Sequence, residues 1–295
     1  MKKEKKVFAL GFFDGVHRGH QALLAECVRL AKELNMETAA ITFLQHPQSL
    51  FVKDPPPLIN TDADRDRLLQ HYGIRNIYKL PVTKEVMSTP WERFLEDLLE
   101  QGAAGFVCGD DFRFGSRGEG DGEKLTSFCR ERGLPCTIVP EQTVDGVRIS
   151  STYIRRLLED GEMATAVKFL GHPHILSGEV VPGRKLGRTI GIPTANILLP
   201  QQLVQPKLGV YACKALVDDE EYLAVTNIGS RPTVGGHQVR AESWLLDFAG
   251  DLYGKEIALA FHRFLREEKK FPDLSELQAE IRKNGSEVRK IFENS

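Results

Sequence analysis

The chain has 295 residues, of which 41% are hydrophobic and 27% charged, as in ordinary soluble globular proteins. This length exceeds one typical hydrophobic core and predicts two domains. The 39 basic and 41 acidic residues leave a net charge of −2, so broad binding of nucleic acid or membrane is not expected, although a local basic pocket is compatible with this balance. Because no apolar run approaches 18 residues, no transmembrane helix is predicted.

The cysteines and the N-terminus favour a cytoplasmic protein. The cysteine count is odd and lacks a C-x-x-C pair, which excludes a disulfide framework and a zinc site. The five are Cys27, Cys108, Cys129, Cys136 and Cys213. The basic start "MKKEKK" precedes an apolar run too short for a secretion signal, and no small-residue cleavage site follows.

The first half alternates between segments with strand and helix patterns. Strands are predicted at residues 6–13, 37–43, 75–82 and 134–140, and residues 104–115 are predicted to be a strand that runs into a loop rich in Gly and Asp. Helices are predicted at residues 20–35, 61–73, 88–102 and 121–133, with two shorter ones at 151–161 and 162–171. This order predicts an α/β domain with a parallel sheet and helices on both faces. Ligands of such sheets bind beyond the carboxyl ends of the strands.

The pattern changes near residues 171–175. Strand-like runs separated by turn residues follow at residues 174–181, 209–217, 221–229, 239–248 and 255–266, and a polar–apolar helix is predicted at 273–293. These runs predict a small antiparallel β-barrel with a terminal helix. We therefore expect an N-terminal domain over residues 1–172 and a C-terminal domain over residues 173–295.

The segment "GFFDGVHRGH" joins the first predicted strand to the first predicted helix. Free N–H groups and the helix dipole at such a junction attract anions, and Gly11 and Gly19 let the backbone approach closely. His17 and His20 can donate hydrogen bonds to phosphate oxygens, which gather charge during phosphoryl transfer. Either histidine alone favours a surface turn, whereas the pair around Gly19 predicts a phosphate site.

A second polar segment, "RISSTYIRRLL", leads another predicted helix. Ser151 and Thr152 are ordinary helix caps, and alone they predict nothing more. Arg148 and Arg155 flank them, so that hydroxyl, N–H and guanidinium groups converge as a polyphosphate requires.

Two further polar segments lie between these, and each follows a predicted strand. They are "TFLQHP", which contains His46, and "GDDFRFGSRGEGD", which contains Asp111. The structural alternatives are a strand-end turn for the first and a flexible glycine loop for the second. The carboxyl ends of parallel strands share one edge, so both side chains are expected near the phosphate site.

The barrel half contains a glycine-rich loop in "VVPGRKLGRTIGIPTANI". Gly183 and Gly187 allow a phosphate to approach the backbone, and Thr194 and Asn196 offer oxygen ligands to a hard cation such as Mg²⁺. A glycine loop of this kind is by itself most often only a connection between strands.

These segments together resemble one family. In this order, "GFFDGVHRGH", "TFLQHP", "GDDFRFGSRGEGD" and "RISSTYIR" are similar to the signatures of bacterial bifunctional riboflavin kinase/FMN adenylyltransferases, the prokaryotic FAD synthetases. The H-x-G-H pair and I-S-S-T-x-x-R are also marks of the wider nucleotidyltransferase superfamily. The segment with "PTAN" resembles the flavokinase signature of the same family. The resemblance covers about residues 7 to 293.

The resemblance implies a Rossmann-like nucleotidyltransferase domain followed by a flavokinase barrel. It implies that the C-terminal domain phosphorylates riboflavin to FMN with ATP and Mg²⁺, and that the N-terminal domain adenylylates FMN to FAD with release of pyrophosphate. Glu242 is then the base on the riboflavin hydroxyl, although as a strand residue it could simply face solvent, and His17 and His20 stabilise the adenylyl-transfer transition state. Expected binding residues are Gly11, Asp14, Gly19, His46, Asp111, Arg148, Ser151, Thr152, Arg155, Gly183, Gly187 and Arg188, with Thr194 and Asn196 on the metal. The expected protein is cytoplasmic, a monomer or weak oligomer, and acts on small molecules.

Two departures from the family pattern leave alternatives open. After Glu242 the family usually has a small or β-branched residue and then histidine, whereas this chain has Ser243 and Trp244. Near the end, Asn284 and Gly285 stand where an acidic residue is common. The alternatives are an FMN adenylyltransferase with weakened or lost kinase activity, a non-catalytic flavin-binding regulatory module, and an adenylyltransferase with another acceptor. The "PTAN" barrel disfavours the last, and the retained polar residues disfavour the module.

Overall fold

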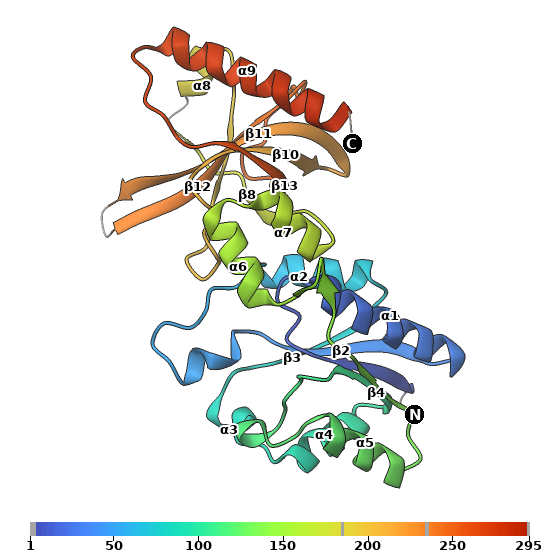
Figure 1. The fold of residues 1–295 in the computed structure, drawn as a ribbon. Coiled ribbons are helices and arrows are strands. Elements are labelled where there is room, and N and C mark those ends of the chain that lie inside the picture. Colours follow the sequence, from blue (N-terminus) through green and yellow to red (C-terminus); the bar gives the residue numbers. More distant parts are fainter. Residues whose placement is uncertain (1–3, 184–185, 234–235, 294–295) are drawn as a thin grey trace. The chain divides into compact units, whose positions relative to one another are not determined.

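The chain forms two compact units (Figure 1). The structure is a computed structural model and describes residues 4–183, 186–233 and 236–293. The first unit contains the chain up to Leu58 together with Asp62–Ser151, and the second contains Ile59–Thr61 and the chain from Thr152 onward.

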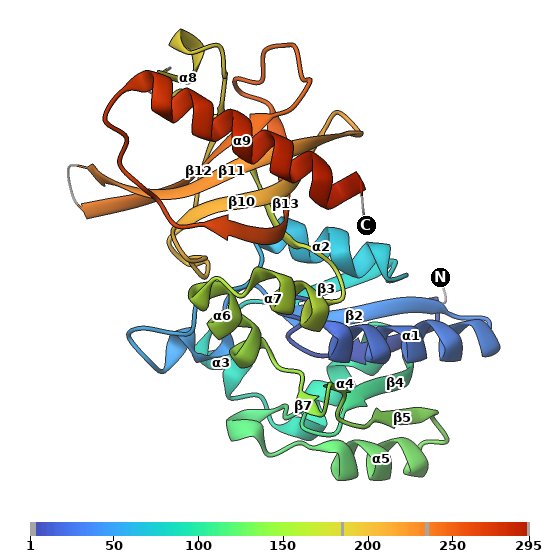
Figure 2. The same ribbon diagram turned by 45° about the horizontal axis from the view of Figure 1, so that its top comes forward.

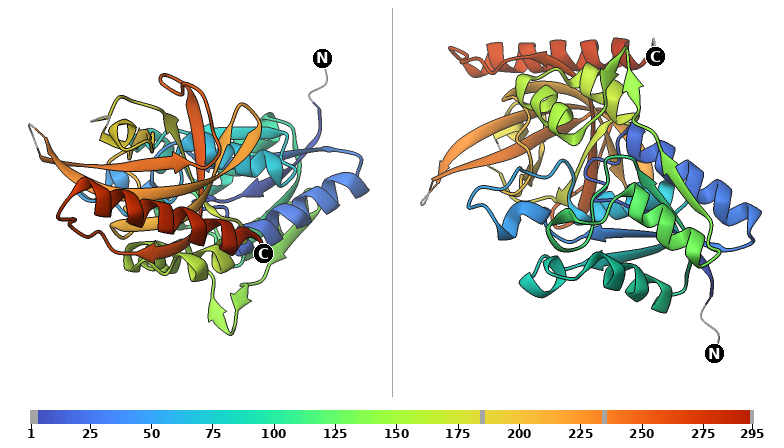
Figure 3. Two further views of the ribbon diagram at one scale, coloured as in Figure 1. Left: turned by 90° about the horizontal axis from the view of Figure 1, so that it is seen from above. Right: turned by 60° about the horizontal axis from the view of Figure 1, so that its bottom comes forward.

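The first unit is built on a five-stranded parallel sheet in the order β3-β2-β1-β4-β5. The strands are β1 (Lys6–Leu10), β2 (Glu37–Phe43), β3 (Asn76–Leu80), β4 (Ala103–Gly109) and β5 (Cys136–Val139). Helices α1 (Arg18–Glu33) and α2 (Asp62–His71) cover one face, and α4 (Trp91–Glu100) and α5 (Gly122–Glu131) cover the other (Figures 2 and 3). The predicted parallel α/β sheet is thus confirmed, and its winding reverses between β1 and β4.

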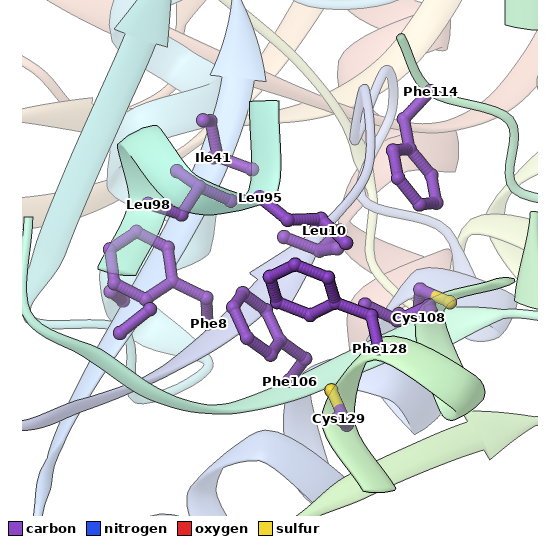
Figure 4. Close-up of a cluster of buried hydrophobic side chains, with 13 residues drawn as sticks. Phe8, Leu10, Ile41, Leu95, Leu98, Phe106, Cys108, Phe114, Phe128 and Cys129 are labelled. Atoms are coloured by element: carbon purple, nitrogen blue, oxygen red, sulfur yellow. The ribbon is translucent and has the colours of Figure 1, made fainter. Parts of the chain in front are cut away.

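Strand β1 is buried on both sides, which is why its sequence is a continuous apolar run. One face meets a cluster of buried side chains from α4 and α5 (Figure 4). The cluster joins Phe8, Leu10 and Phe106 of the sheet to Leu95, Leu98, Leu125 and Phe128 of the helices. On the opposite face, the Cys27 thiol of α1 lies 3.4 Å from the carbonyl of Val7. Each fully buried aromatic or aliphatic side chain contributes about 1.5–3 kcal/mol, so β1 is firmly anchored beneath the loop that follows it.

Short elements follow several strands of the first unit. They are η1 (Pro47–Leu50), α3 (Lys84–Met87), η2 (Ser116–Gly118) and the strand pair β6 (Thr143–Val144) and β7 (Val147–Arg148). The β6–β7 hairpin was not predicted, although its turn carries the usual signal. Asp145 and Gly146 both have positive φ, 52° and 75°, as the two central residues of a type I′ turn require.

The second unit contains a six-stranded antiparallel sheet in the order β8-β13-β10-β11-β12-β9. The strands are β8 (His174–Glu179), β9 (Ala195–Leu198), β10 (Gly209–Val217), β11 (Glu220–Thr233), β12 (Gly236–Leu245) and β13 (Glu256–Arg266). An isolated bridge between Val181 and Asn196 links the ends of the order and nearly closes the sheet. The predicted small antiparallel barrel is confirmed, with β9 as a strand that the sequence pattern did not indicate.

Helices cover the barrel. The terminal helix α9 (Leu274–Glu293) packs across β10 and β11 (Figure 1), and the short α8 (Leu186–Thr189) lies within the glycine-rich segment. Helix α7 (Met163–Leu170) packs on β8 and β13 through buried apolar side chains. These contacts group α7, and α6 (Ser151–Asp160) from Thr152 onward, with the barrel rather than with the parallel sheet. The functional boundary at residues 172/173 stays a prediction.

Candidate active sites

The first unit has a cavity of about 500 Å³ at the carboxyl ends of its strands. Gly11 and Phe12, which follow β1, line it together with Gly109 at the end of β4. This is the point where the strand order reverses, and open α/β sheets bind ligands there. The α1 residues Gly19 and His20 also line the cavity, so the start of this helix faces it.

The turn that precedes α1 is strained and buried. Phe13 and Val16 have φ values of +57° and +38°, and both side chains are completely buried. A β-branched residue with positive φ is rare and costs about 1–3 kcal/mol, which the packing around it must offset. Gly15, at φ +81°, meets the same geometric demand without that cost. The turn therefore fixes the residue that follows it, His17, rather than leaving it on a mobile loop.

His17 is the N-cap of α1. Its Nδ1 accepts a hydrogen bond from the backbone N–H of His20 at 3.3 Å. Because Nδ1 is the acceptor, a neutral His17 carries its proton on Nε2. Sequence periodicity predicted that the helix begins at His20; it begins at Arg18, since the histidine before it supplies the cap.

The two imidazole rings are stacked. Their centroids lie 3.6 Å apart with an interplanar angle of 11°, and both side chains line the cavity. Burial lowers the pKa of His20 well below 6.5, and the neighbouring charge of His17 lowers it further. His20 is thus neutral at pH 7, and its Nδ1 is buried without a hydrogen-bond partner in the part of the chain that the structure describes. Two rigidly held imidazole rings at a helix N-terminus suit an anionic phosphate.

Ser151 connects the segment "RISSTYIRRLL" to the segment "GFFDGVHRGH". Its hydroxyl donates to the carbonyl of Asp14 at 2.8 Å, and Ser151 lines the cavity. Asp14 is 2% exposed and lies beneath the cavity wall as part of the strained turn. Thr152 and Arg155 follow on α6 in the second unit, where Arg155 is buried.

Arg148 ends the β6–β7 hairpin and lies in a small charge cluster on the cavity wall. Its guanidinium contacts Asp111 at 2.6 Å and Glu141 at 2.9 Å, and all three residues line the cavity. The sequence placed Arg148 and Asp111 at the same sheet edge, and the structure brings them into contact. Glu141 was missed, because only the hairpin folds residues 141 and 148 together.

His46 lies near the cavity without lining it. Its Nδ1 accepts from the backbone N–H of Gln48 at 3.2 Å, which makes it the N-cap of η1. Its ring meets the edge of Phe12 at 5.3 Å, and Thr42 donates to the Phe12 carbonyl at 2.7 Å. His46 therefore supports the loop that forms the wall of the cavity.

The second unit has its own cavity, of about 370 Å³. Three neighbouring strands place polar side chains side by side along it. Glu242 on β12 pairs with Asn196 on β9 and with Asn227 on β11, and all three line the cavity. The opposite wall is apolar and includes Leu277 and Ile281 of α9. A polar row that faces an apolar wall suits a substrate with a hydroxyl chain and an aromatic ring.

The glycine-rich loop packs closely around this polar row. A Cβ on Gly187 would overlap the carbonyl oxygen of Ile192, whose N–H donates back to Gly187 at 2.7 Å. Gly183 lies against the Asn196 side-chain amide. Of the predicted loop residues, Gly187 and Thr194 line the cavity; Arg188 lies on α8, with its side chain outside the described part.

Asn196 and Thr194 fit a magnesium site. Asn196 is 4% exposed, and its Oδ1 is buried with no hydrogen-bond partner among the described residues. Thr194 and the carboxylate of Glu242 line the same cavity. Within the described ranges no group of three or more His, Cys, Asp or Glu side chains could hold a metal by itself. Few protein oxygens shared with substrate phosphates are the usual arrangement for Mg²⁺.

Comparisons with known proteins match both units. A family model described as FAD synthetase matches residues 1–153, and one described as riboflavin kinase matches residues 170–292. The bifunctional riboflavin kinase/FMN adenylyltransferase of Escherichia coli K12 is 39% identical over 294 residues, which cover 98% of this chain and 94% of the relative. That of Bacillus subtilis 168 is 34% identical and covers 99% and 94%. The chain belongs to the bifunctional riboflavin kinase/FMN adenylyltransferase family.

A solved structure supports the same two-part fold. A Streptococcus pneumoniae protein described as a macrolide-efflux protein superimposes with a TM-score of 0.87 at 29% identity, covering 98% of this chain and 95% of that one. In the described ranges of the present chain, no helix has the length and apolar character needed to span a membrane.

Ser243 and Trp244, where this chain departs from the family pattern, lie on opposite faces of β12. Ser243 is fully buried inside the barrel and shares a 2.8 Å hydrogen bond with Thr226. Trp244 lies on the other face and lines the second cavity beside Glu242.

Proposed function

We propose that this family member makes FAD from riboflavin in two ATP-dependent steps at two separate sites. The barrel cavity phosphorylates riboflavin to FMN, and the cavity of the parallel sheet transfers AMP from a second ATP to FMN. The observation that carries the proposal is that each unit has its own cavity, lined by the polar residues of its own signature segments.

In the kinase site, Glu242 accepts the proton of the riboflavin 5′-hydroxyl as its oxygen attacks the γ-phosphorus of ATP. The bond from this phosphorus to the β,γ-bridging oxygen breaks, and ADP leaves. The loop around Gly187 brings backbone close to the phosphates. Thr194 and Asn196 hold Mg²⁺, which when bound neutralises the charge on the phosphates. Positioning and electrostatics then account for the catalysis.

In the adenylyltransferase site, a phosphate oxygen of FMN attacks the α-phosphorus of ATP, and pyrophosphate leaves. His17 and His20 donate hydrogen bonds to the α-phosphate oxygens as their charge grows, and the N-terminus of α1 adds its dipole. Arg148 and Ser151, which line this cavity, hold the leaving pyrophosphate. For Arg148 this requires that the guanidinium exchange Asp111 or Glu141 for phosphate oxygens. The same role for Thr152 and Arg155, which the family resemblance implies, stays a prediction.

The substrates are therefore small molecules: riboflavin, FMN and ATP. The chain works in the cytoplasm as a monomer or weak oligomer, and its five free cysteines fit a reducing compartment.

The test is to incubate the purified protein with riboflavin, ATP and Mg²⁺ and to separate riboflavin, FMN and FAD by chromatography. His20→Ala should abolish FAD formation from FMN and leave riboflavin phosphorylation intact, and Glu242→Gln should do the reverse. Equal loss of both activities in either variant contradicts two sites. FAD from added FMN, without FMN from riboflavin, would favour an enzyme with a lost kinase; neither product would favour a non-catalytic module.

A further inference from the structure

Trp244 and Gly285 lie far apart in the sequence and meet above the kinase cavity. Along β12, Ala241, Ser243 and Leu245 are buried, whereas Glu242 and Trp244 point to the opposite face and line the cavity. Two residues along a strand span about 7 Å. The indole therefore lies one extended ribityl chain away from the carboxylate that we assign as the base.

Gly285 is in the interior of the 20-residue helix α9, where glycine is unfavourable relative to alanine. A Cβ at this position would lie 2.7 Å from Cζ3 and 3.2 Å from Cη2 of Trp244. No side chain larger than hydrogen fits unless the indole moves. The missing side chain thus explains how a tryptophan is accommodated on this strand.

Asn284, the residue before Gly285, fixes the same stretch of α9. It is 2% exposed, and its Oδ1 accepts from Nε and Nη2 of Arg266 at 3.2 and 2.9 Å. Arg266 and Asn284 both line the cavity. The helix is therefore held in register over the indole, and Asn284–Gly285 and Trp244 form one packed structure.

We infer that Trp244, held in place by Gly285, packs against the isoalloxazine ring of riboflavin and strengthens riboflavin binding in the kinase site of this chain. The inference rests on the proposed kinase function. An indole offers a flat, electron-rich face to a planar heteroaromatic ring, and Val225, its cross-strand partner, continues the apolar wall. A contact this far from the reacting oxygen contributes to riboflavin binding in ground state and transition state alike.

The test is a double-mutant cycle on riboflavin kinase kinetics. Trp244→His should raise the KM for riboflavin at least about tenfold, with kcat and the KM for ATP little changed. Gly285→Ala should raise the same KM, because its methyl group displaces the indole. In the Trp244→His background, Gly285→Ala should have almost no further effect. Ser286→Ala, on the exposed neighbouring position, is the matched helix control and should change neither constant.

Three results would overturn the inference. They are an unchanged riboflavin KM in both single variants, effects that simply add in the double variant, and a raised KM for ATP in place of riboflavin. An unchanged kcat for riboflavin phosphorylation in the same preparations checks that the barrel has folded. Trp91 and Trp244 are the two tryptophans, so in a Trp91→Phe protein the quenching of tryptophan fluorescence reports riboflavin binding at Trp244. Quenching without FMN formation in the parent protein would refute the kinase function while leaving the binding role intact.

Discussion

His17 has two structural duties that can be separated by substitution. It caps α1 through Nδ1, and it forms half of the stacked pair that faces the first cavity. Replacing it with alanine removes the cap, which is worth about 1 kcal/mol, and the ring contact, worth about 0.5–1.5 kcal/mol. We expect His17→Ala to lower the free energy of unfolding of the first unit by about 1.5–2.5 kcal/mol.

His17→Asp separates the cap from the chemistry. Aspartate is a strong N-cap and complements the helix dipole, so this variant should recover most of the stability lost by alanine. A carboxylate beside the α-phosphate repels it, however, and FAD formation should fall at least 100-fold in both variants and further in His17→Asp. Riboflavin phosphorylation should be unchanged.

Stability can be measured by urea unfolding followed through Trp91, in a Trp244→Phe background that leaves one tryptophan in the first unit. Activity is measured with Trp244 retained, as the rate of FAD formation from FMN and ATP, with FMN formation from riboflavin as the control. If His17→Asp retains normal FAD synthesis, His17 is only a helix cap, and its assignment to the phosphate site is wrong.

Two further predictions test the barrel. Gly187→Ala, whose Cβ would overlap the Ile192 carbonyl, should lower kcat/KM for riboflavin phosphorylation at least about 100-fold and leave FAD formation from FMN unchanged; a normal kinase would remove this loop from the phosphate site. His174 is 4% exposed, and burial followed by the charge of His172 lowers its pKa from 6.5 to about 4. Since the unfolded chain takes up the proton at higher pH, stability falls as pH drops from 6.5 to 4, and the unfolding free energy should be about 2–3 kcal/mol lower at pH 4.5 than at pH 7 from this group. In urea titrations at the two pH values, His174→Phe should remove this part of the pH dependence of the unfolding free energy. A variant whose unfolding free energy still falls by the same amount would contradict the prediction.

Much of the fold could be predicted because its signals are local. The continuous apolar run of β1 reflects burial on both of its sides, and the helical spacing of apolar residues in α1 reflects burial on one side. Strand β9 could not be predicted, since its four residues are set in a segment rich in Gly and Pro and are held by pairing with β12. The β6–β7 hairpin could have been, because Asp145–Gly146 is a recognisable turn pair.

The candidate sites were predictable where a segment folds on itself and less so where segments meet. His17, Gly19 and His20 lie within one turn of a helix, and the structure brings them together at the cavity. Ser151 was expected to serve as a possible helix cap; its bond to the Asp14 carbonyl joins positions 137 apart in the chain. The fit of Trp244 on Gly285 is likewise a tertiary contact. The two departures from the family pattern, Ser243–Trp244 and Asn284–Gly285, look unrelated in the sequence, but this contact joins them in the folded chain.

The most direct test of the two-site account is complementation between two inactive variants. His20→Ala and Glu242→Gln proteins are each incubated with riboflavin, ATP and Mg²⁺, then mixed in equal amounts, and FAD is quantified by chromatography over time. We predict that neither variant alone makes FAD from riboflavin and that the mixture does, since FMN made by the first is adenylylated by the second. A mixture that forms FMN but no FAD, or single variants that retain full FAD synthesis, would contradict the account.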